Sequence, residues 1–164
     1  DAGWRDLPED RAGAVVARLD ALREAPPGEK VADLRRELQE TMDANAQVFR
    51  TEESLSQALA DIAVLRERYA AVSVQDKGAR FNTDLLEAVE LGFLLDLAEI
   101  VVAGALKRRE SRGGHFREDY PDRDDAEFME HTMAYRRVGP DGAEVHLDTK
   151  PVTVTRYQPM ERKY

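Results

Sequence analysis

The residues of this chain that are best suited to chemistry gather in ALKRRESRGGHFREDYPDRDD, residues 105–125. Arginine, histidine and aspartate side chains surround two glycines there, Gly113 and Gly114, together with hydroxyl and aromatic groups. Guanidinium and carboxylate groups form charge-assisted hydrogen bonds of defined geometry, which suits binding or bracing. The composition of this stretch therefore predicts a specific contact surface rather than a solvated spacer.

Other kinds of site find less support. The sequence has no G-x-G-x-x-G, P-loop or G-x-S-x-G motif, so the common phosphate cradles and the hydrolase nucleophile elbow are missing. His115, His131 and His146 fit no helical or finger-type metal spacing, and we expect each to hydrogen-bond to backbone or carboxylate groups. The pair Asp124–Asp125 is expected to cap a short helix rather than to act in acid–base catalysis.

Composition narrows the class of protein. The chain has 164 residues, 42% of them hydrophobic, which suffices for one domain with a core. Its net charge of -9 argues against nucleic acid as a partner, because phosphate binding needs a basic face. The lack of cysteine excludes disulfides and thiolate metal ligands in this chain, as is common in a reducing cytoplasm.

No direct membrane insertion is expected. The most apolar run, residues 94–106, is too short to span a bilayer and carries Asp96 and Glu99. The chain opens with DAGWRDLPED, without an initiator methionine or the basic segment of a signal peptide. We therefore expect a fragment of a longer protein.

Residues 8 to about 110 have the periodicity of helices. Pro8, followed by two acids, is expected to begin the first helix, before a break at Pro26-Pro27-Gly28. The first helix then has an apolar stripe of Val15, Val16, Leu19 and Leu22. The second has one face formed by Val31, Leu34, Leu38, Met42, Asn45 and Phe49.

Two further helices follow. Thr51 can cap the third, whose apolar residues alternate spacings of four and three, as bundle packing requires. Those residues are Leu55, Leu59, Ile62, Leu65, Tyr69 and Val72. The fourth begins near Asn82 or Thr83, is apolar nearly all round from residue 85 to 106, and belongs inside a bundle or under a partner. We expect Lys107, Arg108 and Arg109 in its last turn and Gly113-Gly114 to end it.

The last part of the chain is different in character. HTMAYRRV and AEVHLDT flank Gly139-Pro140-Asp141-Gly142, which predicts a β-hairpin with one face, that of Val145 and Leu147, buried. The end of the chain contains two prolines and is expected to form an extended arm that depends on neighbours for order. The expected fold is mainly α, an antiparallel bundle of three to four helices resembling a spectrin repeat, with a small C-terminal hairpin segment. The expected division is 1–110 for the bundle and 111–164 for the charged loop, hairpin and arm.

One stretch carries a family resemblance. Residues 81–136 closely resemble the C-terminal region of succinate dehydrogenase and fumarate reductase flavoprotein subunits, through a motif S-R-G-x-H-x-R-x-D-x-P-x-R-D-D followed by H-T. Residues 38–55 and 156–164 are also similar to this family, and the ending resembles the actinobacterial type of succinate dehydrogenase. Gly114 stands where the family usually has alanine. The residues of the motif are Ser111, Arg112, Gly113, His115, Arg117, Asp119, Pro121, Arg123, Asp124, Asp125, His131 and Thr132.

The resemblance implies a function for a larger parent protein. Family members oxidise succinate to fumarate on a covalently attached FAD and pass electrons to an iron–sulfur subunit and then to membrane quinone. Their flavin-binding and catalytic residues belong to earlier domains, so no cofactor and no catalytic residue is expected in these 164 residues. The implied partners are the flavin-binding domain of the same chain and the iron–sulfur subunit, at the cytoplasmic face of the cell membrane.

The motif residues other than Pro121 are therefore predicted to dock and brace. Gly113 is expected to take a positive φ, and Arg112 to brace a carboxylate in bidentate fashion. Two alternatives stay open. Arg112, His115 and Asp119 could pin only their own loop to the bundle, and the chain could be an independent helical adaptor that keeps this motif.

Overall fold

The computed structural model describes residues 6, 9–139 and 142–160. The chain packs as two compact units, one of residues up to 43 together with 60–98, the other of 44–59 together with those from 99 onward. The predicted class, a helical bundle followed by a hairpin, is confirmed. The predicted domain boundary at residue 110 stays a prediction.

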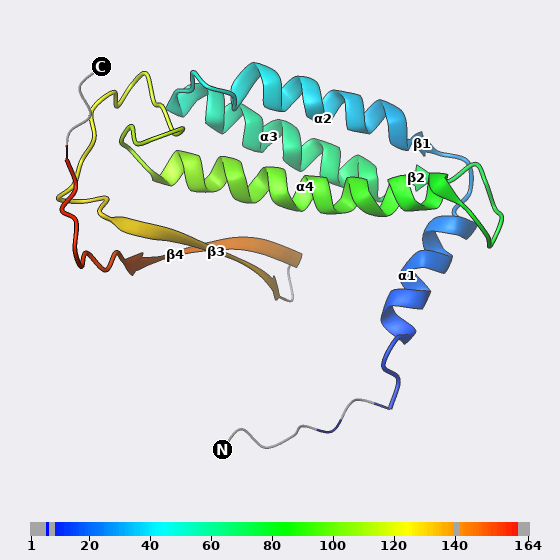
Figure 1. The fold of residues 1–164 in the computed structure, drawn as a ribbon. Coiled ribbons are helices and arrows are strands. Elements are labelled where there is room, and N and C mark those ends of the chain that lie inside the picture. The colour runs from blue at the N-terminus through cyan, green and yellow to red at the C-terminus, as the bar shows by residue number, and fades with distance from the viewer. Residues whose placement is uncertain (1–5, 7–8, 140–141, 161–164) are drawn as a thin grey trace. The chain divides into compact units, whose positions relative to one another are not determined.

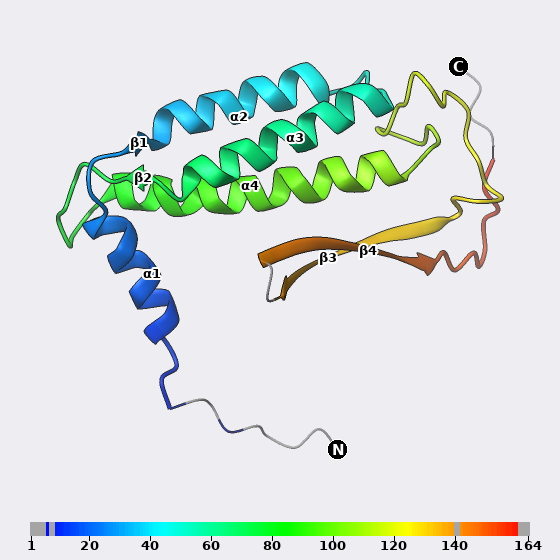
Figure 2. The ribbon, with the colours of Figure 1, turned by 180° about the vertical axis from the view of Figure 1, so that it is seen from behind.

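The first unit has a helical core. In it α2 (Val31–Asn45), the second half of α3 (Glu52–Tyr69) and the first half of α4 (Thr83–Lys107) lie side by side, as both views show (Figures 1 and 2). Two short strands, β1 (Glu29–Lys30) and β2 (Val72–Ser73), pair in parallel. Val31, Leu34, Leu38, Ile62 and Leu65 of the predicted stripes are buried in this unit, as are Leu91 and Leu95 of α4. Val72 is also buried, but it lies in β2 and not in the third helix as predicted, because α3 ends at Tyr69.

The predicted helix starts are confirmed for the last two helices. The amide of Ser54 donates to Thr51 Oγ1 at 3.2 Å, which caps α3. The amide of Leu85 donates to Asn82 Oδ1 at 2.7 Å, which caps α4. Each side chain satisfies an amide that the first helical turn leaves without a partner.

The first helix differs from its prediction. Pro8 lies outside the described residues, and α1 spans Gly13–Glu24, after Glu9 and Asp10. The Asp10 carboxylate accepts the Gly13 amide at 2.7 Å, so this acid precedes the helix instead of standing in its first turn. Val15 and Val16 are 62% and 50% exposed, and no described residue of α1 is buried. The predicted stripe is therefore not a core face.

Two other boundaries were predicted wrongly. α2 ends at Asn45, so Phe49 is not part of its face and is 68% exposed. α4 ends at Lys107, before Arg108 and well before the glycines that were expected to end it. The side chain of Arg117, in the following loop, donates hydrogen bonds to the carbonyls of Ala105 and Leu106, so the end of α4 does not need a glycine cap.

The second unit contains the hairpin. β3 (Glu130–Gly139) and β4 (Gly142–Pro151) pair antiparallel, with Glu130 opposite Pro151. Pro140 and Asp141, at the centre of the predicted turn, lie outside the described residues. An ion pair of 2.8 Å from Arg136 to Glu99 joins β3 to α4.

The predicted buried face of the hairpin, that of Val145 and Leu147, is not fully buried. Val145 and Leu147 are half-buried, and so is His146 between them. A strand with a single neighbour has few packing partners, so alternation alone does not bury one side. After Pro151 the described chain continues to residue 160 without helix or strand. Whether this arm needs a neighbour for order stays a prediction.

Candidate functional site

The ionic loop, residues 108–125, connects α4 to the turn before β3 and is closed by a serine. The Ser111 hydroxyl accepts the amide of Arg117 at 2.9 Å and donates to the carbonyl of Tyr120 at 2.8 Å. The amide of Ser111 donates to the carbonyl of Asp122 at 3.0 Å. Two tight bridges, Arg112 with His115 and Arg117 with Tyr120, fold the chain back on itself. The motif therefore forms a compact, hydrogen-bonded loop.

A glycine makes the first of these bridges possible. Arg112 and His115 exchange amide-to-carbonyl bonds of 2.8 and 3.0 Å around Gly113 and Gly114. Gly113 has φ of 62°, as predicted, whereas Gly114 does not lie in that region. A two-residue hairpin with positive φ at its first central position is the type II′ turn, which needs glycine only there.

The type II′ turn predicts that alanine has different effects on stability at Gly113 and at Gly114. Gly113→Ala should lower the free energy of unfolding by about 1 kcal/mol, because alanine is strained at positive φ. Gly114→Ala should stay within about 0.5 kcal/mol of the parent sequence. A Cβ at either position meets no atom within 4 Å, so steric clash does not contribute to the difference. Urea unfolding of the two variants measures it, and equal stabilities would contradict the assigned turn.

Glu110 is the centre of the ionic loop, and its side chain is fully buried. Arg112 donates to it in bidentate fashion, at 2.8 Å from Nε and 2.9 Å from Nη2, as predicted for that arginine. The amide of Asp124 and the guanidinium of Arg108 also donate to it. Burial acts to raise the pKa of the Glu110 carboxyl, but these donors outweigh it and hold the pKa below its usual value.

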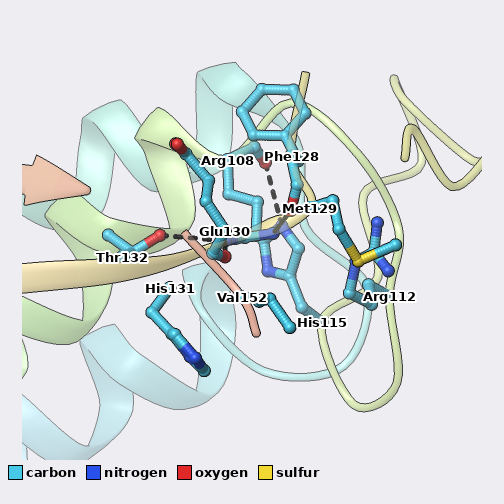
Figure 3. Close-up of a pocket in the computed structure, with 9 residues that line it drawn as sticks. All are labelled: Arg108, Arg112, His115, Phe128, Met129, Glu130, His131, Thr132 and Val152. Atoms are coloured by element: carbon cyan, nitrogen blue, oxygen red, sulfur yellow. Dashed lines mark hydrogen bonds between the residues drawn. The ribbon is translucent and has the colours of Figure 1, made fainter. Parts of the chain in front are cut away.

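Arg108 connects this centre to the hairpin. Its guanidinium donates to the carbonyl of Phe128 at 2.9 Å, to that of Glu130, and to Thr132 Oγ1 at 3.2 Å (Figure 3). It also lies 5.6 Å from the centre of the Phe128 ring. The first residues of β3 are therefore held by a cation that is itself neutralised by Glu110.

A second ion pair joins two helix ends. The Arg117 side chain is fully buried and donates to both carboxylate oxygens of Asp119 at 2.7 Å. Arg117 Nη1 also donates at 3.2 Å to the carbonyls of Ala105 and Leu106, in the last turn of α4. Asp119 accepts the amide of Glu52, the first residue of α3, at 2.8 Å. The cation thus serves a helix C-terminus and the anion a helix N-terminus, each matching the helix dipole.

The remaining acids of the motif are occupied locally. Asp125 accepts from Arg112 at 2.7 Å and from Arg123 at 2.9 Å. The Asp124 carboxylate accepts the amides of residues 126 and 127 and so caps a turn, whereas a short helix capped by the pair Asp124–Asp125 was predicted. Arg123 also donates to the carbonyl of Met160 at 3.0 Å.

The three histidines have separate environments. His115 Nε2 lies 2.9 Å from the carbonyl of Arg108, so this nitrogen carries the proton that is donated. Burial lowers the pKa of His115, as do the nearby charges of Arg50 and other arginines. His131 stands opposite Lys150 in the hairpin, and His146 opposite Tyr135. Among the described residues, no group of three His, Cys, Asp or Glu side chains is placed to hold a metal ion.

A hollow of about 450 Å³ lies beside the loop, walled by residues of the loop, of the start of β3 and by Val152 (Figure 3). Two of its walls are Arg108 and Arg112, whose guanidinium groups are already engaged by Glu110 and backbone carbonyls. These two guanidinium groups therefore stabilise the loop, and they are not free to bind a molecule in the hollow.

Sequence reasoning missed the most connected residues of the site. Glu110 is not among the residues predicted for the site, and Arg108 was predicted only as a cation in the last turn of α4. Arg50 was not singled out. A signal for Glu110 was present, since it is a lone acid between Arg109 and Arg112 directly after an apolar helix.

Comparison with known proteins gives a consistent result. Residues 35–164 match the family model described as fumarate reductase flavoprotein C-term. The chain is 44% identical over 152 residues to the succinate dehydrogenase flavoprotein subunit of Rickettsia bellii, covering 92% of this chain and 25% of that protein. It is 38% identical over 154 residues to the fumarate reductase flavoprotein subunit of Mycobacterium tuberculosis, covering 94% of this chain and 26% of that protein.

Solved structures agree with these matches. The E. coli quinol fumarate reductase FrdA superposes with a TM-score of 0.88 at 35% identity, over 98% of this chain and 28% of that one. The Mycobacterium smegmatis Sdh1 complex in the apo form contains a chain that superposes with a TM-score of 0.80 at 29% identity, over 93% of this chain and 26% of that one. This chain spans about a quarter of the length of the curated relatives that it matches.

Proposed function

Because the chain belongs to the family of fumarate reductase flavoprotein C-terminal domains, we propose that it is the non-catalytic C-terminal part of a succinate dehydrogenase or fumarate reductase flavoprotein. In this proposal the parent oxidises succinate to fumarate on FAD and passes the electrons to an iron–sulfur subunit and then to quinone. The parent acts at the cytoplasmic face of the membrane. None of the described helices is long and apolar enough to cross a membrane.

The observation that carries a bracing role is the arrangement of the Arg117–Asp119 pair. One ion pair satisfies the last carbonyls of α4 and the first amide of α3. The side chains of Arg117 and Asp119 are therefore engaged by each other and by the two helix ends, and that of Arg112 is engaged within the loop. We infer that the predicted motif residues brace the domain, and that a rigid loop of this kind presents neighbouring residues to the flavin-binding domain and the iron–sulfur subunit.

The described residues do not fit an FAD site by themselves. A flavin dinucleotide needs a glycine-rich turn that leads into a helix N-terminus with free amides. Here Gly113 and Gly114 form a hairpin turn away from any helix start, and the amide of Glu52 at the start of α3 is taken by Asp119. No reaction step is therefore assigned to this chain.

The proposal predicts different properties for the 164-residue chain and for its full-length parent. The 164-residue chain alone should fold into a helical protein by circular dichroism, yet show no flavin absorbance and no succinate-dependent dye reduction. The full-length parent, purified in the same way, should show all three. Turnover of succinate by the chain alone would overturn the proposal, as would a parent without flavin.

The proposed partner can be tested in the parent complex. Arg112→Leu removes a bracing group without touching the buried apolar core, so the flavoprotein should still fold. Retention of the iron–sulfur subunit on an affinity-tagged flavoprotein should fall by about tenfold, because the loop loses a brace and no longer presents its neighbouring residues in a fixed geometry. Retention at the yield of the unaltered protein would leave Arg112 with a role inside its own loop only.

A further inference from the structure

One cation beside the ionic loop, Arg50, has no ion-pair partner among the residues that the structure describes. Residues 46–51, between α2 and α3, lie against the loop through a bridge between Arg50 and Arg117 and a 3.0 Å bond from the Glu118 amide to the Arg50 carbonyl. Arg50 Nε donates to the carbonyl of Gln47 at 2.8 Å. Within the described part of the chain, no carboxylate lies within ion-pair distance of the Arg50 guanidinium.

The arginines near Arg50 differ from it in their ion pairing. Arg108, Arg112 and Arg117 each have a carboxylate within 2.8 Å. Arg50 is half-buried, and the charged group that acts on it is Arg117, of the same sign. Exposed cations without partners are solvated by water, but a half-buried guanidinium next to another cation is less well solvated and is not stabilised by a counter-charge.

Exposed apolar side chains adjoin this cation in the sequence. Val48 is 59% exposed and Phe49 is 68% exposed. The Phe49 ring meets the ring of Phe116 edge to face, with centroids 5.8 Å apart, so the ionic loop holds the aromatic side chain in place. The exposed Phe49 ring thus lies against the half-buried Phe116, next to a guanidinium that has no ion pair in the described part of the chain. This is the composition of an interface centre.

We propose that Val48, Phe49, Arg50 and Phe116 form a docking patch that receives an acidic, apolar segment from the flavin-binding part of the same polypeptide. This inference rests on the proposed function, since it requires a parent that contains such a part. The incoming carboxylate pairs with Arg50 in bidentate fashion, and an apolar neighbour of that carboxylate covers the two rings.

The small size of the patch favours an occupant in the same polypeptide. Stable interfaces between separate proteins use on the order of 20–30 residues a side, whereas this patch consists of a single guanidinium and three apolar side chains. A tethered segment is present at an effective concentration of millimolar order, so a small patch suffices to hold it. The relatives are about four times as long as this chain, which leaves ample sequence for the segment.

The test uses the full-length parent in its native complex. Phe49 is replaced by the photo-crosslinking amino acid p-benzoylphenylalanine, and cross-linked peptides are identified by mass spectrometry. The expected product joins position 49 to a peptide of the same polypeptide that precedes residue 1 and contains Asp or Glu. A cross-link to a different subunit, to a second copy, to residues 1–164 alone, or to nothing would overturn the proposal.

Charge variants give the second arm of the test. Arg50→Glu should reduce the yield of that cross-link by about tenfold, the effect of one lost charge-assisted contact. Arg109→Glu is the matched control, because Arg109 is exposed in the same unit and also lacks an ion-pair partner in the described part of the chain. The cross-link yield should not change in this control, and an equal loss in both variants would contradict the role proposed for Arg50.

Failure of this inference can be told apart from failure of the proposed function. Bound flavin and succinate-dependent dye reduction are measured on the same preparations. A parent with both properties but without the expected cross-link refutes only the docking patch. A parent that lacks both refutes the proposed function, whatever position 49 contacts.

Discussion

Glu110→Ala should cost this chain about 3–5 kcal/mol of unfolding free energy, the effect of removing one partner from a buried ion pair. The carboxylate is fully buried, and its loss leaves the amide of Asp124 without its acceptor and takes from Arg108 and Arg112 the carboxylate that they share. Because Arg108 also holds the first residues of β3, the loss should spread to the hairpin. Urea unfolding, followed by circular dichroism, measures the effect.

A nearby acid provides the control for this experiment. Glu127 is exposed, and its carboxylate has no ion pair in the described part of the chain, so Glu127→Ala should change the stability by less than about 0.5 kcal/mol. Hydrogen exchange should show faster exchange of the β3 amides in Glu110→Ala only. A loss below about 1 kcal/mol for Glu110→Ala would mean that the loop is not organised by this carboxylate.

Asp119→Asn should cost about 3 kcal/mol at neutral pH, because it removes the close countercharge of the fully buried Arg117 guanidinium and leaves only the Glu52 carboxylate, 4.0 Å away. The double variant Arg117→Met with Asp119→Leu should lose less than the sum of the two single changes, since no charge is then left unpaired. Additive losses would show that the two residues act independently.

This pair also gives the stability a defined pH dependence. The hydrogen bonds from Arg117 lower the pKa of Asp119 from 3.8 to about 2. The unfolded chain therefore takes up this proton first, so the stabilisation is present above about pH 4 and is lost as the pH falls toward about 2. The stability gap between the parent sequence and Asp119→Asn should narrow over that window. NMR titration of the Asp119 carboxyl checks the pKa directly, and a midpoint near 4 would contradict the pairing.

His115 adds a weaker dependence of the same sign at higher pH. Its pKa is lowered, first by burial, so the unfolded chain binds a proton more readily than the folded one. The stabilisation is present above the ordinary value of 6.5 and declines as the pH falls below it. The ionic loop is therefore most stable near neutral pH, where Asp119 is charged and His115 is neutral.

The sequence by itself determined the helices of the bundle and the family. Apolar spacings of three and four predicted α2 and α3, and a run that is apolar nearly all round predicted α4. Thr51 and Asn82 marked two of the helix starts, because caps and periodicity are local properties of a helix. The motif around Gly113 identified the family and the positive φ. The predicted actinobacterial type stays a prediction.

Local signals were less informative where a helix borders an irregular segment. α1 starts after Asp10, and α4 ends at Lys107 with Arg117 in place of the expected glycine cap. A glycine pair is a good sign of a helix end, but here it serves a turn six residues later, because a side chain from the loop already satisfies the carbonyls of α4.

Only the tertiary structure decided which hydrogen-bond partners the charged side chains have. Asp119 meets Glu52 across 67 positions of sequence, and Arg108 meets Thr132 across 24. Opposite charges occur at many spacings in a chain with 24 basic and 33 acidic residues, so composition cannot select among them. The ends of α3 and α4 have to come together before Arg117 and Asp119 can serve both. The same packing places Arg50 beside Arg117 with no carboxylate at ion-pair distance in the described part of the chain, an arrangement that no local pattern in the sequence could reveal.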